Sequence, residues 1–123
     1  MSTLVDTSVL VDFIRDLPAA HRFLQELDGK PSISVVSIQE LYAGAHSSGE
    51  ERRIETSLPG WHVLNVTPAI ARSAGQHMRH FAPSHGLDDL DALIAATAEH
   101  QGLELATINV RHFPMFRRLK RAY

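Results

Sequence analysis

The sequence predicts a single α/β domain over residues 1–123, a three-layer α/β/α sandwich around a central, mainly parallel sheet. Short apolar or β-branched runs alternate along the chain with longer segments whose apolar residues recur at helical i, i+3, i+4 spacing. Strands that alternate with helices build parallel sheets covered on both faces. A length of 123 residues with 44% apolar and 21% charged side chains fits one ordinary globular domain.

The first part of the chain predicts two strands. Residues 4–5 form a short apolar run that ends at Asp6, and a helix is expected beyond it because apolar residues then recur at helical spacing. Pro18 suits the first turn of a second helix. The β-branched run at 32–36 predicts the second strand, and Ser37 is expected to open the helix that follows.

The second part continues the alternation. Charge pattern indicates a helix over 50–57, and residues 61–66 predict a third strand. Thr67 and Pro68 are a helix cap and first position, and residues 83–86 are expected to be a loop. The strongest helix of the chain follows and ends at Gly102, and residues 103–106 predict the fourth strand.

Composition excludes some classes of protein and leaves others open. The formal charge of −2 does not indicate a nucleic-acid binder, but basic residues crowd the last stretch of the chain, where they could contact phosphate or form a solvated surface. The absence of cysteine excludes disulfides and thiolate metal sites. We find no signal peptide and no apolar run that could span a bilayer, so a cytoplasmic protein without membrane contact is expected.

Acidic side chains stand at equivalent places beside three predicted elements. Asp6 follows the first strand, Glu40 and Asp91 lie in first helical turns, and Asn109 follows the last strand. In a parallel sheet these side chains share the carboxyl edge, where ligands bind. Gathered carboxylates repel each other by roughly 1–4 kcal/mol per pair. A divalent cation such as Mg²⁺ or Mn²⁺, which prefers oxygen ligands, would reverse that repulsion.

Each carboxylate also has a purely structural interpretation. Ser37-x-x-Glu40 fits a capping box, in which Glu40 folds back onto the backbone. Asp88 could cap the late helix and leave Asp91 merely favourable to the helix dipole. Asp6 could cap the first helix. The coincidence of all three carboxylates at one edge is what favours a functional site.

Other polar residues carry weaker signals. His77 and His80 share a helix face and His85 follows, which could suit zinc, but no further ligand has a convincing spacing. The loop acids Asp88 and Asp89 could help hold a metal or simply be solvated.

Four blocks of sequence together carry a resemblance to a known family. They are LVDTSVL at 4–10, SIQELYAG at 37–44, DALIAATA at 91–98 and ATINVRHF at 106–113. In this order they resemble the PIN-domain family, and within it the VapC-type toxins of bacterial and archaeal toxin–antitoxin (VapBC) pairs. The likeness spans essentially the whole chain.

The resemblance implies an α/β/α sandwich, Mg²⁺-dependent endoribonuclease activity that Mn²⁺ can support, a homodimer, and inhibition by a cognate VapB-type antitoxin. By position, Asp6, Glu40 and Asp91 match the family's metal-binding and catalytic acids. Asn109 falls where many PIN domains carry a fourth acid. Its neutral amide contributes less charge toward a second metal, so one metal or two remain open.

The resemblance also suggests supporting residues. Thr7 or Ser8 would orient Asp6 by hydrogen bonding, and Thr107 would do so from the opposite side. Arginines near the end of the chain would steer and anchor RNA; they are Arg111, Arg117 and Arg118.

We therefore expect metal-assisted hydrolysis of RNA, with Asp6 and Asp91 holding the ion and Glu40 binding the ion or the attacking water. The target could be tRNA, ribosomal RNA or messenger RNA. The alternatives are a PIN-fold nuclease of RNA processing without a toxin role, a silent binding module, and an aspartyl-phosphate or receiver-like protein. An aspartyl-phosphate or receiver-like protein requires a second acid at the position of Ser8, or a lysine after a late strand. The lysines of the chain are Lys30 and Lys120.

Overall fold

The computed structural model describes residues 2–123 and contains a four-stranded sheet in the order β3-β2-β1-β4. All three strand pairs are parallel. The strands are β1 (Thr3–Val5), β2 (Ser32–Ser34), β3 (His62–Leu64) and β4 (Glu104–Ala106). The predicted fold class and the parallel sheet are confirmed.

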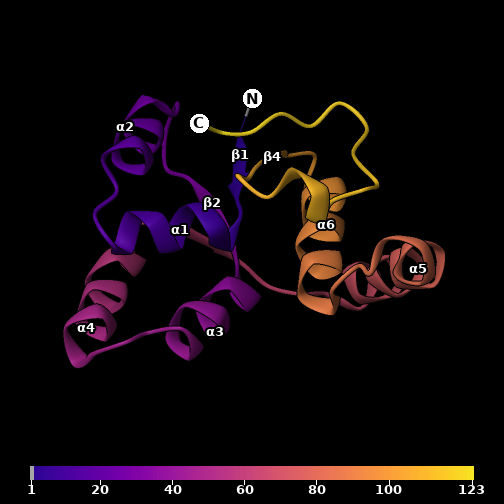
Figure 1. The fold of residues 1–123 in the computed structure, drawn as a ribbon, viewed down its shortest axis with the longest axis horizontal. Coiled ribbons are helices and arrows are strands. Elements are labelled where there is room, and N and C mark those ends of the chain that lie inside the picture. Colours follow the sequence, from indigo (N-terminus) through magenta and orange to yellow (C-terminus); the bar gives the residue numbers. More distant parts are fainter. Residues whose placement is uncertain (1) are drawn as a thin grey trace.

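Helices cover both faces of this sheet (Figure 1). They are α1 (Thr7–Ile14), α2 (Pro18–Glu26), α3 (Val35–Ala43), α4 (Ser48–Ser57), α5 (Pro68–His85) and α6 (Asp89–Gln101). Figure 1 shows α1 to α4 on one side of the strands and α5 and α6 on the other. Two short 3₁₀ turns, Leu58–Gly60 and Val110–His112, complete the regular structure.

The first strand supplies side chains to both cores. Side chains alternate across a strand, so Val5 packs into the cluster beneath α1, α3 and α4, whereas Leu4 packs with α6 and Phe113. Both are fully buried. Asp6 comes directly after them and takes the carboxyl edge of the sheet.

Two predicted boundaries are wrong, for identifiable reasons. Ser34, not Ser37, caps α3, because the Ser34 hydroxyl accepts a hydrogen bond from the Val36 backbone N–H at 3.2 Å. The strand therefore ends two residues earlier than predicted, and Ser37 is buried inside the helix. The predicted loop at 83–86 is the end of α5, which continues through Pro83. A proline this close to a helix end removes only one backbone hydrogen bond, and the helix ends at Gly86 in the left-handed conformation.

Other predicted helix starts are confirmed. Pro18 occupies the first turn of α2, and the Thr67 hydroxyl accepts a hydrogen bond from the Ile70 N–H at 3.2 Å with Pro68 following it. Within residues 2–123, no helix is both long and apolar enough to cross a membrane.

Candidate active site

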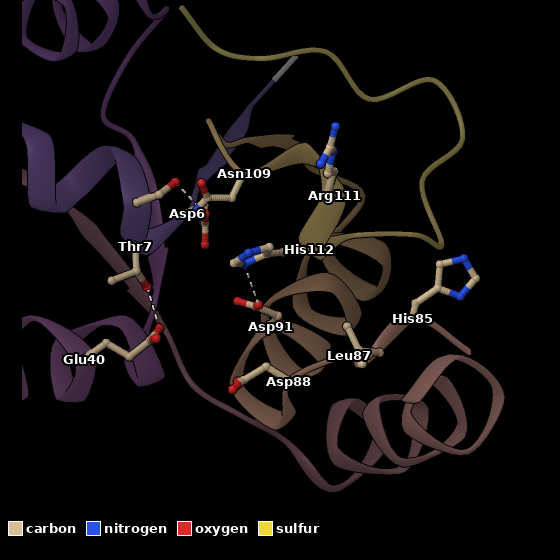
Figure 2. Close-up of a pocket in the computed structure, with 12 residues that line it drawn as sticks. Asp6, Thr7, Glu40, His85, Leu87, Asp88, Asp91, Asn109, Arg111 and His112 are labelled. Atoms are coloured by element: carbon tan, nitrogen blue, oxygen red, sulfur yellow. Dashed lines mark hydrogen bonds and ion pairs between the residues drawn. The ribbon is translucent and has the colours of Figure 1, made fainter. Parts of the chain in front are cut away.

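The polar side chains predicted to share one sheet edge do line a single cavity of about 490 Å³ (Figure 2). Asp6 enters it from the end of β1, Glu40 from α3, Asp91 from α6, and Asn109 from the segment after β4. These positions are far apart in sequence. The parallel order of the strands brings Asp6, Glu40 and Asn109 together because the segments after β1, β2 and β4 leave the sheet at the same edge. Asp91 reaches this edge from the first turn of α6, the helix that precedes β4.

Asp6 is the most firmly held of these acids. It is buried, and its Oδ2 accepts hydrogen bonds from Ser8 Oγ and Thr107 Oγ1, both at 2.7 Å. Asp6 does occupy the N-cap position of α1, as its capping interpretation predicts, but its side chain makes no capping bond to the helix. The hydroxyls of Ser8 and Thr107, from opposite ends of the chain, instead hold the carboxylate toward the cavity. The resemblance suggested this orienting role for both residues.

The prediction that Glu40 lies in a first helical turn is wrong, because α3 begins at Val35 and places Glu40 in its second turn. Thr7 binds it there, with its hydroxyl donating to Glu40 Oε1 at 2.6 Å. The same Thr7 oxygen is 2.8 Å from Ser37 Oγ. The capping-box interpretation is therefore wrong, since neither partner serves the helix terminus. Burial raises the pKa of Glu40; the Thr7 hydrogen bond lowers it, and the charges of Asp6 and Asp88 raise it.

Asp91 lies in the first turn of α6, but the capping bond is made by Asp88, whose Oδ1 accepts from the Leu90 N–H at 2.8 Å. Burial raises the pKa of Asp91 to about 7, and the charge of Asp6 adds to the effect. The His112 ring, with Nδ1 3.2 Å from Asp91 Oδ2, opposes it. The capping bond of α6 is thus made by Asp88 and not by Asp91, which faces the cavity.

The opposite wall of the cavity contains residues that sequence reasoning did not place in the site. These residues are His85, Gly86, Leu87 and His112. Arg111, which was expected to contact RNA, lines the same wall. Figure 2 shows His85 and Arg111 at the rim, away from Glu40. These residues could not be predicted as part of the site because residues 83–86 were expected to be a loop. In the structure α5 continues to His85, and Gly86, in the left-handed conformation, turns the chain toward the edge of the cavity.

Arg117 and Arg118 lie elsewhere, in an open hollow of about 710 Å³ beside the edge strand β4, with an apolar lining that includes Leu105 and Phe116. Of the three arginines expected to contact RNA, only Arg111 lines the carboxylate cavity. A role in RNA binding for Arg117 and Arg118 stays a prediction.

Residues 3–120 match the family model described as the PIN domain. The chain belongs to the PIN-domain family. Over 120 residues, covering 95% of this chain and 90% of the relative, it is 46% identical to ribonuclease VapC10 of Mycobacterium tuberculosis. It is 41% identical over 124 residues to ribonuclease VapC19 of the same organism, covering 98% of each. The similarity to these relatives shows that the chain is a VapC-type ribonuclease toxin, and it confirms the predicted family and activity.

Solved structures agree with this assignment. A toxin–antitoxin complex from Klebsiella pneumoniae contains a chain with a TM-score of 0.85 and 27% identity, covering 99% of this chain and 98% of that one. A DNA-bound VapBC from Salmonella typhimurium gives 0.80 at 23% identity, covering 100% of this chain and 99% of that one, and supports the fold.

PIN-domain ribonucleases of the VapC type are generally metal-dependent. Among residues 2–123, no three His, Asp or Glu side chains stand close enough to form a ready-made metal site. The donor chemistry nevertheless fits a hard cation, since carboxylates, an amide and hydroxyls line the cavity. Burial is the main cause of the raised pKa values of Glu40 and Asp91, and the charge of Asp6 raises both further. His77 and His80 do not line this cavity.

Proposed function

We propose that this VapC-type toxin is a Mg²⁺-dependent endoribonuclease, for which Mn²⁺ can substitute, and that it hydrolyses phosphodiester bonds in the cavity of Asp6, Glu40 and Asp91. One observation carries the proposal. Three acids from distant segments line one cavity, and burial together with mutual repulsion raises the pKa of two of them. This arrangement of acids does not stabilise the fold, but it suits the binding of a cation.

The cation would be held by Asp6 and Asp91, with Asn109 as a neutral further ligand. When bound, Mg²⁺ supplies Lewis-acid catalysis, because it polarises the phosphate and lowers the pKa of water. Ser8 and Thr107 keep Asp6 in one orientation. Such supporting hydrogen bonds to a metal ligand are worth about 10–100-fold in metal affinity or activity.

Glu40 is the proposed general base for the attacking water, or a further ligand of the cation. Thr7 fixes Oε1, whereas Oε2 has no hydrogen-bond partner among residues 2–123. A carboxylate whose pKa is raised by burial is better suited to accept a proton from the attacking water. The water oxygen then bonds to phosphorus as the bond to the leaving ribose oxygen breaks.

The substrate class we favour is single-stranded or loop RNA, whether in tRNA, ribosomal RNA or messenger RNA, and the site of action is then the cytoplasm. A side-chain cavity reads splayed bases better than the deep groove of an A-form duplex. Arg111 at the rim supplies positive charge beside an otherwise acidic cavity.

We also propose a VapB-type antitoxin as partner and a homodimer as the working unit. The support for the antitoxin is that similar solved chains come from toxin–antitoxin complexes. An antitoxin arginine that pairs with the cavity carboxylates would inhibit by competing with the cation. These likenesses favour the toxin over an RNA-processing nuclease, and the family decides against an aspartyl-phosphate protein.

The test replaces Asp6→Asn, with Asp28→Asn as a matched control because Asp28 is exposed and does not line the cavity. We expect Asp6→Asn to remain folded but to lose more than about 100-fold in RNA cleavage, beyond the loss typical of supporting residues. EDTA should abolish wild-type cleavage and Mg²⁺ restore it. Wild-type cleavage by Asp6→Asn, or cleavage that survives EDTA, would refute the mechanism.

A further inference from the structure

A second hollow, of about 360 Å³, adjoins the active-site cavity and shares a wall with it. Asn109, Arg111 and His112 line both. Ile108, Val110 and Arg121 line the second one alone. Its volume falls within the range of about 300–1,000 Å³ usual for ligand sites.

The two hollows differ in charge. Four acids line the first (Asp6, Glu40, Asp88 and Asp91), whereas no acid of the described part of the chain lines the second. The charged side chains of the second are Arg111 and Arg121, and within residues 2–123 neither forms a salt bridge with an Asp or Glu side chain. Figure 2 shows the Arg111 side chain extending away from the carboxylates. Guanidinium groups are common protein ligands of phosphate. The hydrogen bond of Arg121 uses its Nε alone.

Arg121 is held at a fixed place relative to the catalytic edge. Its Nε donates to the main-chain oxygen of Tyr123 at 3.3 Å, and the next residue, Ala122, donates its N–H to Thr107 O at 2.8 Å. The Tyr123 hydroxyl in turn donates to Asp12 Oδ2 at 2.6 Å on α1. Because Thr107 also binds Asp6, the segment that carries Arg121 is anchored to the residue that orients the catalytic acid.

We propose that this second hollow is a phosphate subsite for the RNA backbone, in which Arg111 and Arg121 bind a phosphate that flanks the scissile one. The inference rests on the proposed ribonuclease function and deepens it. RNA leaving the carboxylate cavity meets the shared wall of Asn109 and His112 and then the basic hollow. The subsite thereby adds the charge of Arg121 to that of Arg111, beside a cavity whose four acids would repel a polyanion.

The test measures binding of a fluorescein-labelled single-stranded RNA by anisotropy in EDTA, over a series of NaCl concentrations. Each phosphate contact to a single strand contributes about 0.7 to the slope of log affinity against log salt. Arg121→Ala should therefore flatten the slope by about 0.7 and weaken binding roughly fivefold at 0.1 M salt. Arg121→Lys keeps the charge and should keep most of the slope.

Arg72→Ala is the matched control, because Arg72 is exposed on α5 and lines neither hollow. Arg117→Ala tests the rival path over the β4 edge. The proposal is overturned if Arg121→Ala binds with the wild-type slope, if Arg72→Ala loses as much, if Arg121→Lys loses as much as Arg121→Ala, or if Arg117→Ala alone flattens the slope.

Cleavage separates this subsite from the catalytic proposal. Arg121→Ala should raise KM more than it lowers kcat, and shortening the RNA until it no longer reaches the hollow should erase the difference from wild type. An Asp6→Asn protein that still cuts RNA would refute the catalytic assignment, whereas an unchanged salt slope in Arg121→Ala would refute the subsite alone.

Discussion

Asp6 and Asp91 face the same cavity but are held in opposite ways. Asp6 is buried and accepts two hydroxyl hydrogen bonds, from Ser8 and Thr107. Within the described residues 2–123 no hydroxyl donates to Asp91 and the His112 ring is its close partner, while burial and the charge of Asp6 raise its pKa to about 7. One carboxylate is therefore fixed in advance by the fold, and the other depends on a proton or a cation.

This difference separates positioning from binding. Hydroxyl donors hold a carboxylate in one orientation whether or not a cation is bound. A carboxylate without hydrogen-bond donors beside another acid destabilises the folded chain when no cation is bound. A bound cation removes this repulsion, and the free energy gained contributes to cation binding. Mutations at the two positions should therefore differ in stability even where they agree in activity.

The largest effects are expected from Asp91→Asn and Asp6→Asn. Both should lose more than about 100-fold in cleavage, as metal ligands. Asp91→Asn should stabilise the metal-free protein at pH 8, because the folded state there must ionise an acid whose pKa is raised from 3.8 to about 7. The full shift corresponds to about 4 kcal/mol, which solvent in the open cavity reduces to about 1–2 kcal/mol.

Asp6→Asn should instead lower the melting temperature, because two charge-assisted hydrogen bonds worth about 1.5–3 kcal/mol each are weakened. Thermal unfolding in EDTA measures both variants, and added Mg²⁺ should raise the melting temperature of the wild type but of neither variant. A lower melting temperature for Asp91→Asn would contradict the view that Asp91 is the strained carboxylate.

A smaller effect is expected from Thr107→Val, which keeps the shape of the side chain but removes one donor to Asp6. Cleavage should fall by about 10–100-fold, as for other supporting residues of metal ligands. The matched control is Thr56→Val, since the Thr56 hydroxyl donates only to Arg53 O on the exposed face of α4. Equal activity of the two variants would show that the orientation of Asp6 does not depend on Thr107.

Much of this site could be predicted from sequence, because strand ends and first helical turns follow from local pattern. Asp6, Glu40, Asp91 and Asn109 were found in this way, and the structure brings all of them to one cavity. The pattern could not decide between Ser34 and Ser37 as the cap of α3, since both hydroxyls precede apolar helical residues and tertiary contact with Thr7 decides it.

The wall formed by His85 and the hollow around Arg121 could not be predicted. The first depends on a helix that continues past a proline, and local propensity favours stopping there. The second depends on how residues 119–123 fold back against Thr107, a contact between the end of the chain and the sheet edge that leaves no periodic signal.

The pH dependence sharpens the contrast between the two acids. Asp91 holds its proton up to about pH 7 in the folded state and only to about 3.8 in the unfolded chain, so stability in EDTA should fall as pH rises between these values. Cleavage at low Mg²⁺ should rise about tenfold per pH unit below 7, since the proton competes with the cation. Higher Mg²⁺ should move the midpoint to lower pH; a midpoint independent of Mg²⁺ would contradict competition at Asp91.

The smallest effect is expected from His112→Gln, which removes the histidine ring that pairs with Asp91. The imidazolium lowers the pKa of Asp91, so its loss should move the midpoint of cleavage upward. Because half-exposed ion pairs are worth about 0.2–1 kcal/mol, the shift should stay below about 0.7 pH unit. His112→Lys, which keeps a positive charge at all these pH values, should move the midpoint downward. Opposite shifts in the two variants follow only if His112 acts through its charge; a common shift would mean that it acts through packing.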